Sequence, residues 1–298
     1  MNFEAALKAL SLSDAVVACA AGRIKSPICT LEAPAQWFGF PPALVPIWSD
    51  GSRPTYIGYW KHWFVEREPC FVKMFVSSDR MTTEIARTPS QLFGVIAMMA
   101  ISLDDGVTLD LEQFAARVGL ENLSELDAVS LKTGDDPKGF PKAELFRTLT
   151  PLECISYDGN PYMGDFPSEF ARGNWWETSC SFEVLNKNMR ISESASLPGW
   201  FDPAQVKTTL FENFMSAGRL DYAWLTLNST GWLIADARRA IIELQARTSD
   251  EVFGCVAASW LSFADDSAGG LLSEEEKGAI YLRTNAEGQI CWFCSVYK

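Results

Sequence analysis

Runs of apolar residues with two different spacings divide the chain into predicted strands and helices. Alternating or continuous apolar runs predict strands at 55–60, 70–76, 222–227, 279–284 and 289–296. The last two flank a short loop, 285–288, that ends in Gly288, so we expect them to pair as an antiparallel hairpin. Turn residues at 49–52 separate the strand at 55–60 from the apolar run at 43–48, which indicates a second extended segment there.

Capping residues predict where the helices begin and end. The capping box Thr88-Pro89-Ser90-Gln91 predicts a helix to about Ser102, and its residues are apolar nearly all round, which is typical of a buried helix. Similar signals predict four more helices: from Asp110 to Gly119, from Asp202-Pro203 to Gly218, from a cap at Ser229 or Thr230 through 246, and from a capping box at Thr248 to about Phe263.

Strands followed by runs of helices predict an α+β fold, with mixed or antiparallel sheets and packed helices. A Gly- and Pro-rich aromatic stretch, 156–200, has little periodicity and separates two halves. We therefore predict an α+β half at 1–150 and a second α+β half with the terminal hairpin at 151–298, either as two domains or as one continuous domain.

The composition is that of a folded, acidic protein. Of 298 residues, 48% are hydrophobic and 12% aromatic, and 38 acidic residues against 25 basic ones give a net charge of −13. This apolar content excludes a largely disordered chain, and the lack of clustered Lys and Arg speaks against a nucleic-acid partner. The acidity is regional, because residues 1–100 hold nine basic and eight acidic side chains and residues 101–200 hold 8 and 17.

We expect a cytoplasmic protein without a signal peptide or a membrane-spanning segment. No basic segment followed by an uninterrupted apolar run opens the chain, and the apolar run at 92–101 is shorter than the roughly 20 residues that cross a bilayer. The eight cysteines are spread along the chain, mostly in apolar runs, which is typical of buried free thiols. Cys291 and Cys294 have C-x-x-C spacing but lie in a predicted strand, so we favour a structural role for both.

Candidate catalytic chemistry is sparse. The only histidine is His62, so any catalytic triad or dyad with histidine depends on it, and the loop motifs of hydrolases, dinucleotide-binding proteins and P-loop proteins are missing. We therefore assign no catalytic, cofactor-binding or metal-binding residue. His62 lies in the aromatic cluster 59–64, which we interpret as a core layer with a hydrogen-bonded histidine; the alternative is an exposed binding platform.

The segment 37–64 carries a resemblance to a known family. Its arrangement of an apolar residue, Pro-Ile, Asp-Gly and Tyr resembles the central part of the SUKH superfamily, and the matching residues are Val45, Pro46, Ile47, Asp50, Gly51 and Tyr56. The resemblance covers about residues 30–100. It implies an α+β fold that binds a protein partner, commonly a bacterial toxin domain neutralised by an immunity protein.

The candidate partner-binding residues lie in two acidic regions. The first is the acid-rich run 104–136, and the second is the loop 158–177, where acidic and aromatic residues alternate irregularly. From these regions we select Asp104, Asp105, Asp127, Asp135, Asp136, Asp158, Tyr162, Asp165, Glu169, Trp175 and Trp176. The alternative for the first region is an ordinary solvated helix face.

These observations leave three hypotheses for the function. The first is an immunity protein that occludes the active site of a basic toxin domain with its acidic surface, since opposite charges speed association. The second is a hydrolase that uses two carboxylates of the 158–177 loop. The third is a scaffold or regulatory module, which also predicts a protein-binding surface.

Overall fold

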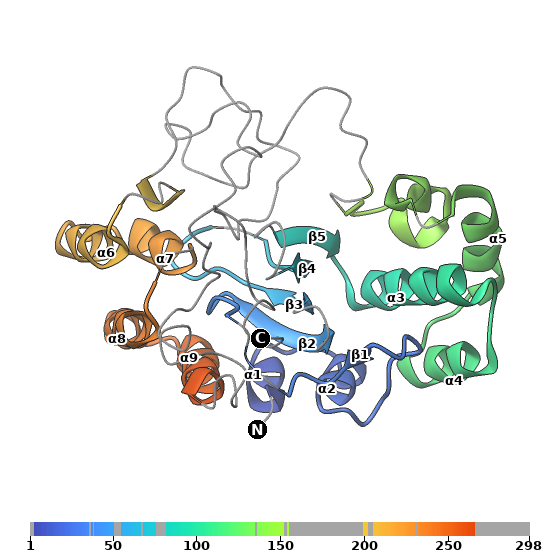
Figure 1. The fold of residues 1–298 in the computed structure, drawn as a ribbon, viewed down its shortest axis with the longest axis horizontal. Coiled ribbons are helices and arrows are strands. Elements are labelled where there is room, and N and C mark those ends of the chain that lie inside the picture. Colours follow the sequence, from blue (N-terminus) through green and yellow to red (C-terminus); the bar gives the residue numbers. More distant parts are fainter. Residues whose placement is uncertain are drawn as a thin grey trace, which may run out of the picture.

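A five-stranded antiparallel sheet lies at the centre of the molecule (Figure 1). The computed structural model describes residues 3–35, 37, 39–50, 55–66, 68–75, 82–134, 136–151, 154, 199–201, 205–229 and 232–265. The strands pair in chain order: β1 (Leu31–Glu32), β2 (Leu44–Asp50), β3 (Thr55–Trp60), β4 (Cys70–Phe75) and β5 (Thr82–Ala86). The predicted α+β class is confirmed, as are the strand at 55–60, the strand at 70–76 over its described residues 70–75, and the extended segment at 43–48, which continues as β2 through Ser49 and Asp50 where a turn was predicted.

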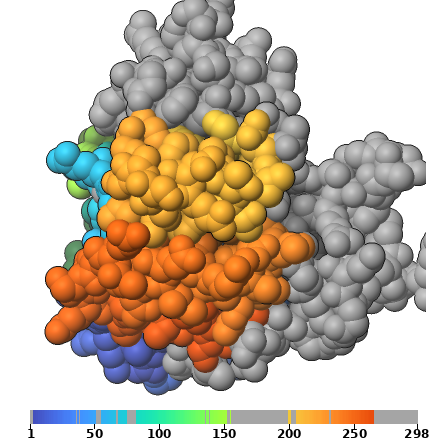
Figure 2. Space-filling model, turned by 90° about the vertical axis from the view of Figure 1, so that its left-hand side faces the viewer, coloured from blue at the N-terminus to red at the C-terminus, as the bar shows by residue number. Residues whose placement is uncertain are grey.

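Helices cover the sheet in three groups (Figure 1). The groups are α1 (Glu4–Ala9) and α2 (Asp14–Ala20); then α3 (Pro89–Asp104), α4 (Leu109–Val118) and α5 (Leu123–Thr133) with the short helices η1 (Pro137–Lys142) and η2 (Glu144–Phe146); and η6 (Gly199–Phe201) with α6 (Lys207–Ser216), α7 (Leu220–Leu227), α8 (Ile234–Gln245) and α9 (Glu251–Asp265). In Figure 1 the α3–α5 group lies on the right of the sheet and the α6–α9 group on the left. Figure 2 shows α6–α9 as a continuous layer, with N-terminal residues below it.

The predicted starts of α3, α4 and α9 lie within two residues of those observed, whereas α6 begins at Lys207, after the predicted start at Asp202-Pro203. Thr88 accepts a hydrogen bond from the Gln91 amide, so α3 begins as predicted. Helix α4 begins two residues earlier than a cap at Asp110 predicts, because Thr108 caps it. At α9 the capping side chain is Asp250, which accepts from the amides of Val252 and Phe253. The predicted helix through 246 is confirmed as α8, but it begins at Ile234 after Leu233, and the Ser229 hydroxyl donates to the carbonyl of Thr226 and does not cap it; Thr230 lies outside the described residues.

The predicted strand at 222–227 is wrong, because this segment forms helix α7. Every side chain from Tyr222 to Leu227 is buried, so the apolar residues follow no single face. Thr226 donates its hydroxyl to the carbonyl of Tyr222 at 2.7 Å, the bond to the preceding helical turn that a threonine makes. The predicted terminal strands at 279–284 and 289–296 lie outside the described residues, as do Cys291 and Cys294.

Two buried acceptors, one backbone carbonyl and one imidazole ring, link the last helices to the sheet. The carbonyl of Phe40 accepts from the indole Nε1 of Trp37 at 3.1 Å and from that of Trp260, on α9, at 3.2 Å. The imidazole of His62 lies between two further indoles. Its Nε2 is 2.8 Å from Nε1 of Trp60, and its Nδ1 is 2.9 Å from Nε1 of Trp224, on α7. A neutral imidazole has one nitrogen lone pair, so it accepts from one of these two indoles at a time.

His62 is therefore part of the core, as predicted. Its side chain is 6% exposed, and its ring lies among the aromatic rings of Trp60 and Trp224. A third link joins the same two regions: the Asn228 side chain, after α7, accepts from the amide of Ala43 at 2.7 Å and donates to the carbonyl of Trp224. One cluster of buried side chains accordingly extends from Phe3 to Ala264.

A bulge in β2 lies opposite a close backbone approach in β3. Pro46 pairs with Gly58 and Trp48 pairs with Ile57, so Ile47 is an extra residue on β2. A Cβ atom at Gly58 would lie 2.5 Å from the carbonyl oxygen of Val45 and 2.9 Å from the Cα of Pro46. Both are backbone atoms, which cannot move aside without displacing β2.

Replacement of Gly58 by alanine should therefore destabilise the protein by about 1–3 kcal/mol, the usual cost of inserting a methyl group into a packed core. The matched control is Gly254→Ala in α9, where the added Cβ meets only the flexible end of Gln245, at 3.4 Å. Alanine there should be neutral or stabilising by up to about 1 kcal/mol. Urea unfolding of both variants measures the two effects, and equal stabilities would contradict the proposed approach of β2 and β3.

Candidate protein-binding surface

Several described acidic side chains outside α3–α5 are paired with basic ones. Glu4 contacts Arg23 and Lys8, and these partners lower the pKa of Glu4 to about 2. Further acidic residues pair with an arginine close in sequence: Glu84 with Arg87, Glu144 with Arg147, Asp221 with Arg219 and Asp236 with Arg239. In most of these pairs one negative charge is cancelled by one positive charge, so the pairs add little net charge that could attract a partner.

The end of α3, the start of α4 and the connection between them, residues 103–112, bring several acids close together in sequence, and we call this segment the α3–α4 corner. Four of its side chains are exposed acids: Asp104, Asp105, Asp110 and Glu112. Within the described part of the chain, no ion pair joins any of the four to a basic side chain. The corner therefore presents four uncompensated negative charges.

Large apolar side chains are exposed among these acids. Leu103 and Leu109 are each 67% exposed, and Val107 is 36% exposed. Apolar anchors surrounded by charged groups are typical of protein-binding surfaces, where the apolar contact supplies affinity and the charges guide the partner. The corner thus combines both kinds of contact within ten residues.

Two of the four acids occupy positions that do not favour stability. Asp104 is the last residue of α3 and Asp105 its C-cap, where the negative end of the helix dipole repels an anion. Asp105 also adopts φ 58°, a left-handed conformation that glycine takes more readily. Asp110 and Glu112, in contrast, lie in the first turn of α4, where the dipole favours them. Fold stability therefore accounts for the second pair of acids and not for the first.

An acidic cleft of about 420 Å³ lies beside the N-terminus of α3. It is lined by residues of the α3 N-terminus, the α4–α5 connection and the segment 144–149, among them Glu121, Glu125 and Glu144. Glu125 accepts from the backbone amide of Glu144 at 2.9 Å, and Glu144 pairs with Arg147. Its lining contains no Lys or Arg, and of its carboxylates only Glu144 is in an ion pair within the described structure, so a basic side chain would find Glu121 and Glu125 without a competing cation.

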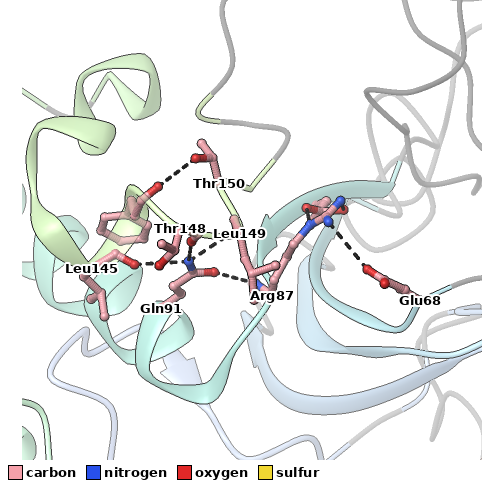
Figure 3. Close-up of polar contacts among 9 residues, drawn as sticks. Glu68, Arg87, Gln91, Leu145, Thr148, Leu149 and Thr150 are labelled. Atoms are coloured by element: carbon pink, nitrogen blue, oxygen red, sulfur yellow. Dashed lines mark hydrogen bonds and ion pairs between the residues drawn. The ribbon is translucent and has the colours of Figure 1, made fainter.

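Gln91 fixes one wall of this cleft (Figure 3). Its Nε2 donates to the carbonyls of Leu145, Thr148 and Leu149 at 3.1, 2.9 and 3.3 Å, and its Oε1 accepts from the Arg87 amide at 2.8 Å. The residue is 2% exposed, so losing these bonds would leave a buried amide without partners, which is costly. One buried amide therefore holds the 145–149 segment against α3.

Of the predicted partner-binding residues, four are described. Asp104 and Asp105 lie at the α3–α4 corner and are exposed. Asp127, on α5, is half-buried, with one carboxylate oxygen enclosed and without a hydrogen-bond partner in the described structure. Asp136 is exposed just before η1. The remaining seven lie outside the described residues: Asp135, Asp158, Tyr162, Asp165, Glu169, Trp175 and Trp176. The carboxylates of the hydrolase hypothesis lie there too.

Sequence reasoning did not find the apolar part of the corner or the cleft. Leu103 and Leu109 extend apolar patterns that are otherwise buried, so only the three-dimensional ends of α3 and α4 show their exposure. In the described ranges, no three His, Cys, Asp or Glu side chains are placed to hold a metal ion. No helix among these residues combines the length and apolar character that crossing a membrane requires.

A comparison with known protein families, curated proteins and solved structures finds no match to this chain. The SUKH-like resemblance of residues 30–100 therefore remains a prediction.

Proposed function

We propose that this chain is a cytoplasmic protein-binding protein that neutralises a basic partner, a toxin domain, by covering its active site. The observation that carries this proposal is the α3–α4 corner, where unpaired acids and exposed leucines lie side by side. Asp104 and Asp105 are placed against the preferences of their helix end. Residues kept at a local cost to stability are most readily explained by function.

The charge distribution supports a basic partner in particular. Unpaired carboxylates attract a cationic surface over about a Debye length, roughly 8 Å at physiological salt, which raises the association rate. The exposed side chains of Leu103 and Leu109 would then leave water at the contact and slow dissociation. The acidic cleft would accept a lysine or arginine of the same partner between Glu121 and Glu125.

Co-expression with the product of the toxin-like gene nearest its own is the direct experiment. We expect a stable complex that survives purification, and survival of cells that the toxin alone kills. If the chain neither binds nor protects against the product of any neighbouring gene, the proposed function is wrong.

Charge reversal then locates the contact. The double variant Asp104→Lys, Asp105→Lys should lower the association rate about tenfold or more and flatten its salt dependence. The control, Glu212→Lys with Glu243→Lys, changes the net charge equally but at exposed positions on α6 and α8. Stopped-flow association at two salt concentrations measures both variants, and equal slowing in the two would show that only the net charge matters.

A second variant separates stability from binding at one residue. Asp105→Gly removes the left-handed strain and the unfavourable charge, so it should raise the free energy of unfolding by about 1 kcal/mol while slowing association. Ser11→Gly is the control, because Ser11 also has positive φ but lies between α1 and α2. It should gain stability and keep the wild-type association rate. An Asp105→Gly variant that binds normally would place the contact elsewhere.

A further inference from the structure

The ring of His62, the only histidine in the sequence, has a hydrogen-bond donor facing each of its two nitrogens. Nε1 of Trp60 lies 2.8 Å from Nε2 of the imidazole, and Nε1 of Trp224 lies 2.9 Å from Nδ1. An indole nitrogen only donates, so both positions require an acceptor on the imidazole. The two indoles belong to different parts of the fold, since Trp60 is the last residue of β3 and Trp224 lies in the middle of α7.

A neutral imidazole can accept from one of these two indoles, and an imidazolium can accept from neither. The neutral ring has one nitrogen with a lone pair, while the other nitrogen carries a hydrogen that faces the second indole. The imidazolium has no lone pair and carries a hydrogen on both nitrogens. Both indoles would then face a donor at hydrogen-bond distance, so protonation of His62 would replace the link between β3 and α7 by a repulsion.

Burial of the three rings also opposes a charge on the imidazole. His62 is 6% exposed, Trp60 is 2% exposed and Trp224 is fully buried. A cation enclosed by apolar rings loses its hydration, which disfavours the charged form. Each indole meets the imidazole with its N–H edge, at interplanar angles of 69° and 86°, so the cation would not lie over the face of an aromatic ring, where cation–π attraction could offset this cost.

The charged groups near the ring do not reverse this preference. On the described elements around the ring, the titratable side chains nearest to it in sequence or strand register are Tyr59, Lys61, Cys70, Asp221, Tyr222, Glu251 and Cys255. Of the two carboxylates, Asp221 is in an ion pair with Arg219 at 2.8 Å, and Glu251 is exposed in the first turn of α9. The tyrosines and cysteines are neutral at the pH at which histidine titrates. The charge closest in sequence is that of Lys61, which is positive and disfavours an imidazolium beside it.

We propose that His62 is an acid-sensitive switch between β3 and α7. The neutral ring holds the two elements together, and uptake of a proton forces Trp224 away from Nδ1. Trp224 moves rather than Trp60, because Trp60 is only two residues from His62 on the same segment. The second link of this layer, from Trp260 to the carbonyl of Phe40, does not respond to acid because a backbone carbonyl does not titrate. The switch does not involve the α3–α4 corner, so it does not depend on the proposed function.

The direction of the pH dependence follows from which state binds the proton. Once α7 has separated from β3, the imidazole is exposed and titrates near the ordinary histidine pKa of about 6.5, whereas the closed state excludes the proton. The closed state is therefore fully favoured above about pH 7 and loses stability as the pH falls through about 6.5. Between pH 7.5 and 5.5 the population of the separated state should rise about tenfold, which corresponds to about 1.4 kcal/mol. Carboxylates add little in this range, because their ordinary pKa values lie near 4.

Native-state hydrogen exchange at pH 7.5 and 5.5, corrected for the intrinsic exchange rate at each pH, measures this rise at the amides of α7. Their protection should fall about tenfold in the wild type. His62→Gln keeps an acceptor oxygen and does not titrate in this range, so its α7 protection should be equal at the two pH values, whatever its absolute level. Trp260→Phe is the matched control, because it breaks the link that does not titrate and should keep the tenfold change. Equal protection of α7 at both pH values in the wild type, or a tenfold loss that persists in His62→Gln, would overturn the proposal.

The single histidine also allows a measurement on the unaltered protein, which holds if the variants fail to fold. The imidazole resonances in an NMR spectrum belong to His62 alone, and their chemical shifts report its protonation. In the folded protein they should keep the shifts of a neutral ring from pH 7.5 to 5.5. A midpoint near pH 6.5 in the folded state, with the indole N–H resonances of Trp60 and Trp224 unmoved, would contradict the proposal, because it would show that an imidazolium fits between the two indoles.

Discussion

The need of buried indole N–H groups for an acceptor organises this structure. An indole has one N–H donor and no acceptor, and burying that donor without a partner is costly. The Phe40 carbonyl receives Trp37 and also Trp260, which is 220 residues away along the chain. The two ring nitrogens of His62 face the indole N–H groups of Trp60 and of Trp224, 162 residues away, and the ring accepts from one of them at a time. Helices α7 and α9 are thereby fixed to the region of β2 and β3.

The demand for hydrogen-bond partners also distinguishes side chains that hold the fold together from side chains that are left to contact another molecule. On the side of α6–α9, aromatic residues and Asn228 are committed to holding the helices against the sheet. On the side of α3–α5, Gln91 holds the backbone, while the acids of the α3–α4 corner have no basic partner in the described structure.

The sequence predicted features that depend on neighbouring residues. The cap at Thr88, the strands at 55–60 and 70–76 and the buried histidine follow from local spacing, and the structure confirms them. Helix α7 could not be predicted in this way, because burial on all sides removes the periodicity that separates helix from strand. Strand β5 was missed because its Glu84 looks solvent-facing in the sequence, whereas Arg87 allows it to be 4% exposed.

The α3–α4 corner was only partly predictable, because part of it depends on tertiary structure. Counting charges located Asp104 and Asp105, but exposure of Leu103 and Leu109 depends on where α3 and α4 end in space. An unsatisfied indole such as that of Trp48 leaves no trace in sequence, because its partner or lack of one depends on residues far along the chain. The sequence thus did not predict those site residues whose exposure or lack of a hydrogen-bond partner depends on tertiary contacts.

Hydrogen exchange measured in increasing urea tests most directly whether the shared indole acceptors join the two parts of the chain. If Phe40 and His62 hold α7 and α9 to the sheet, the amides of α9 and of β3 should lose protection at the same urea concentration, as one cooperative unit. Loss of protection in α6–α9 at clearly lower urea, with β2–β4 still protected, would contradict this account.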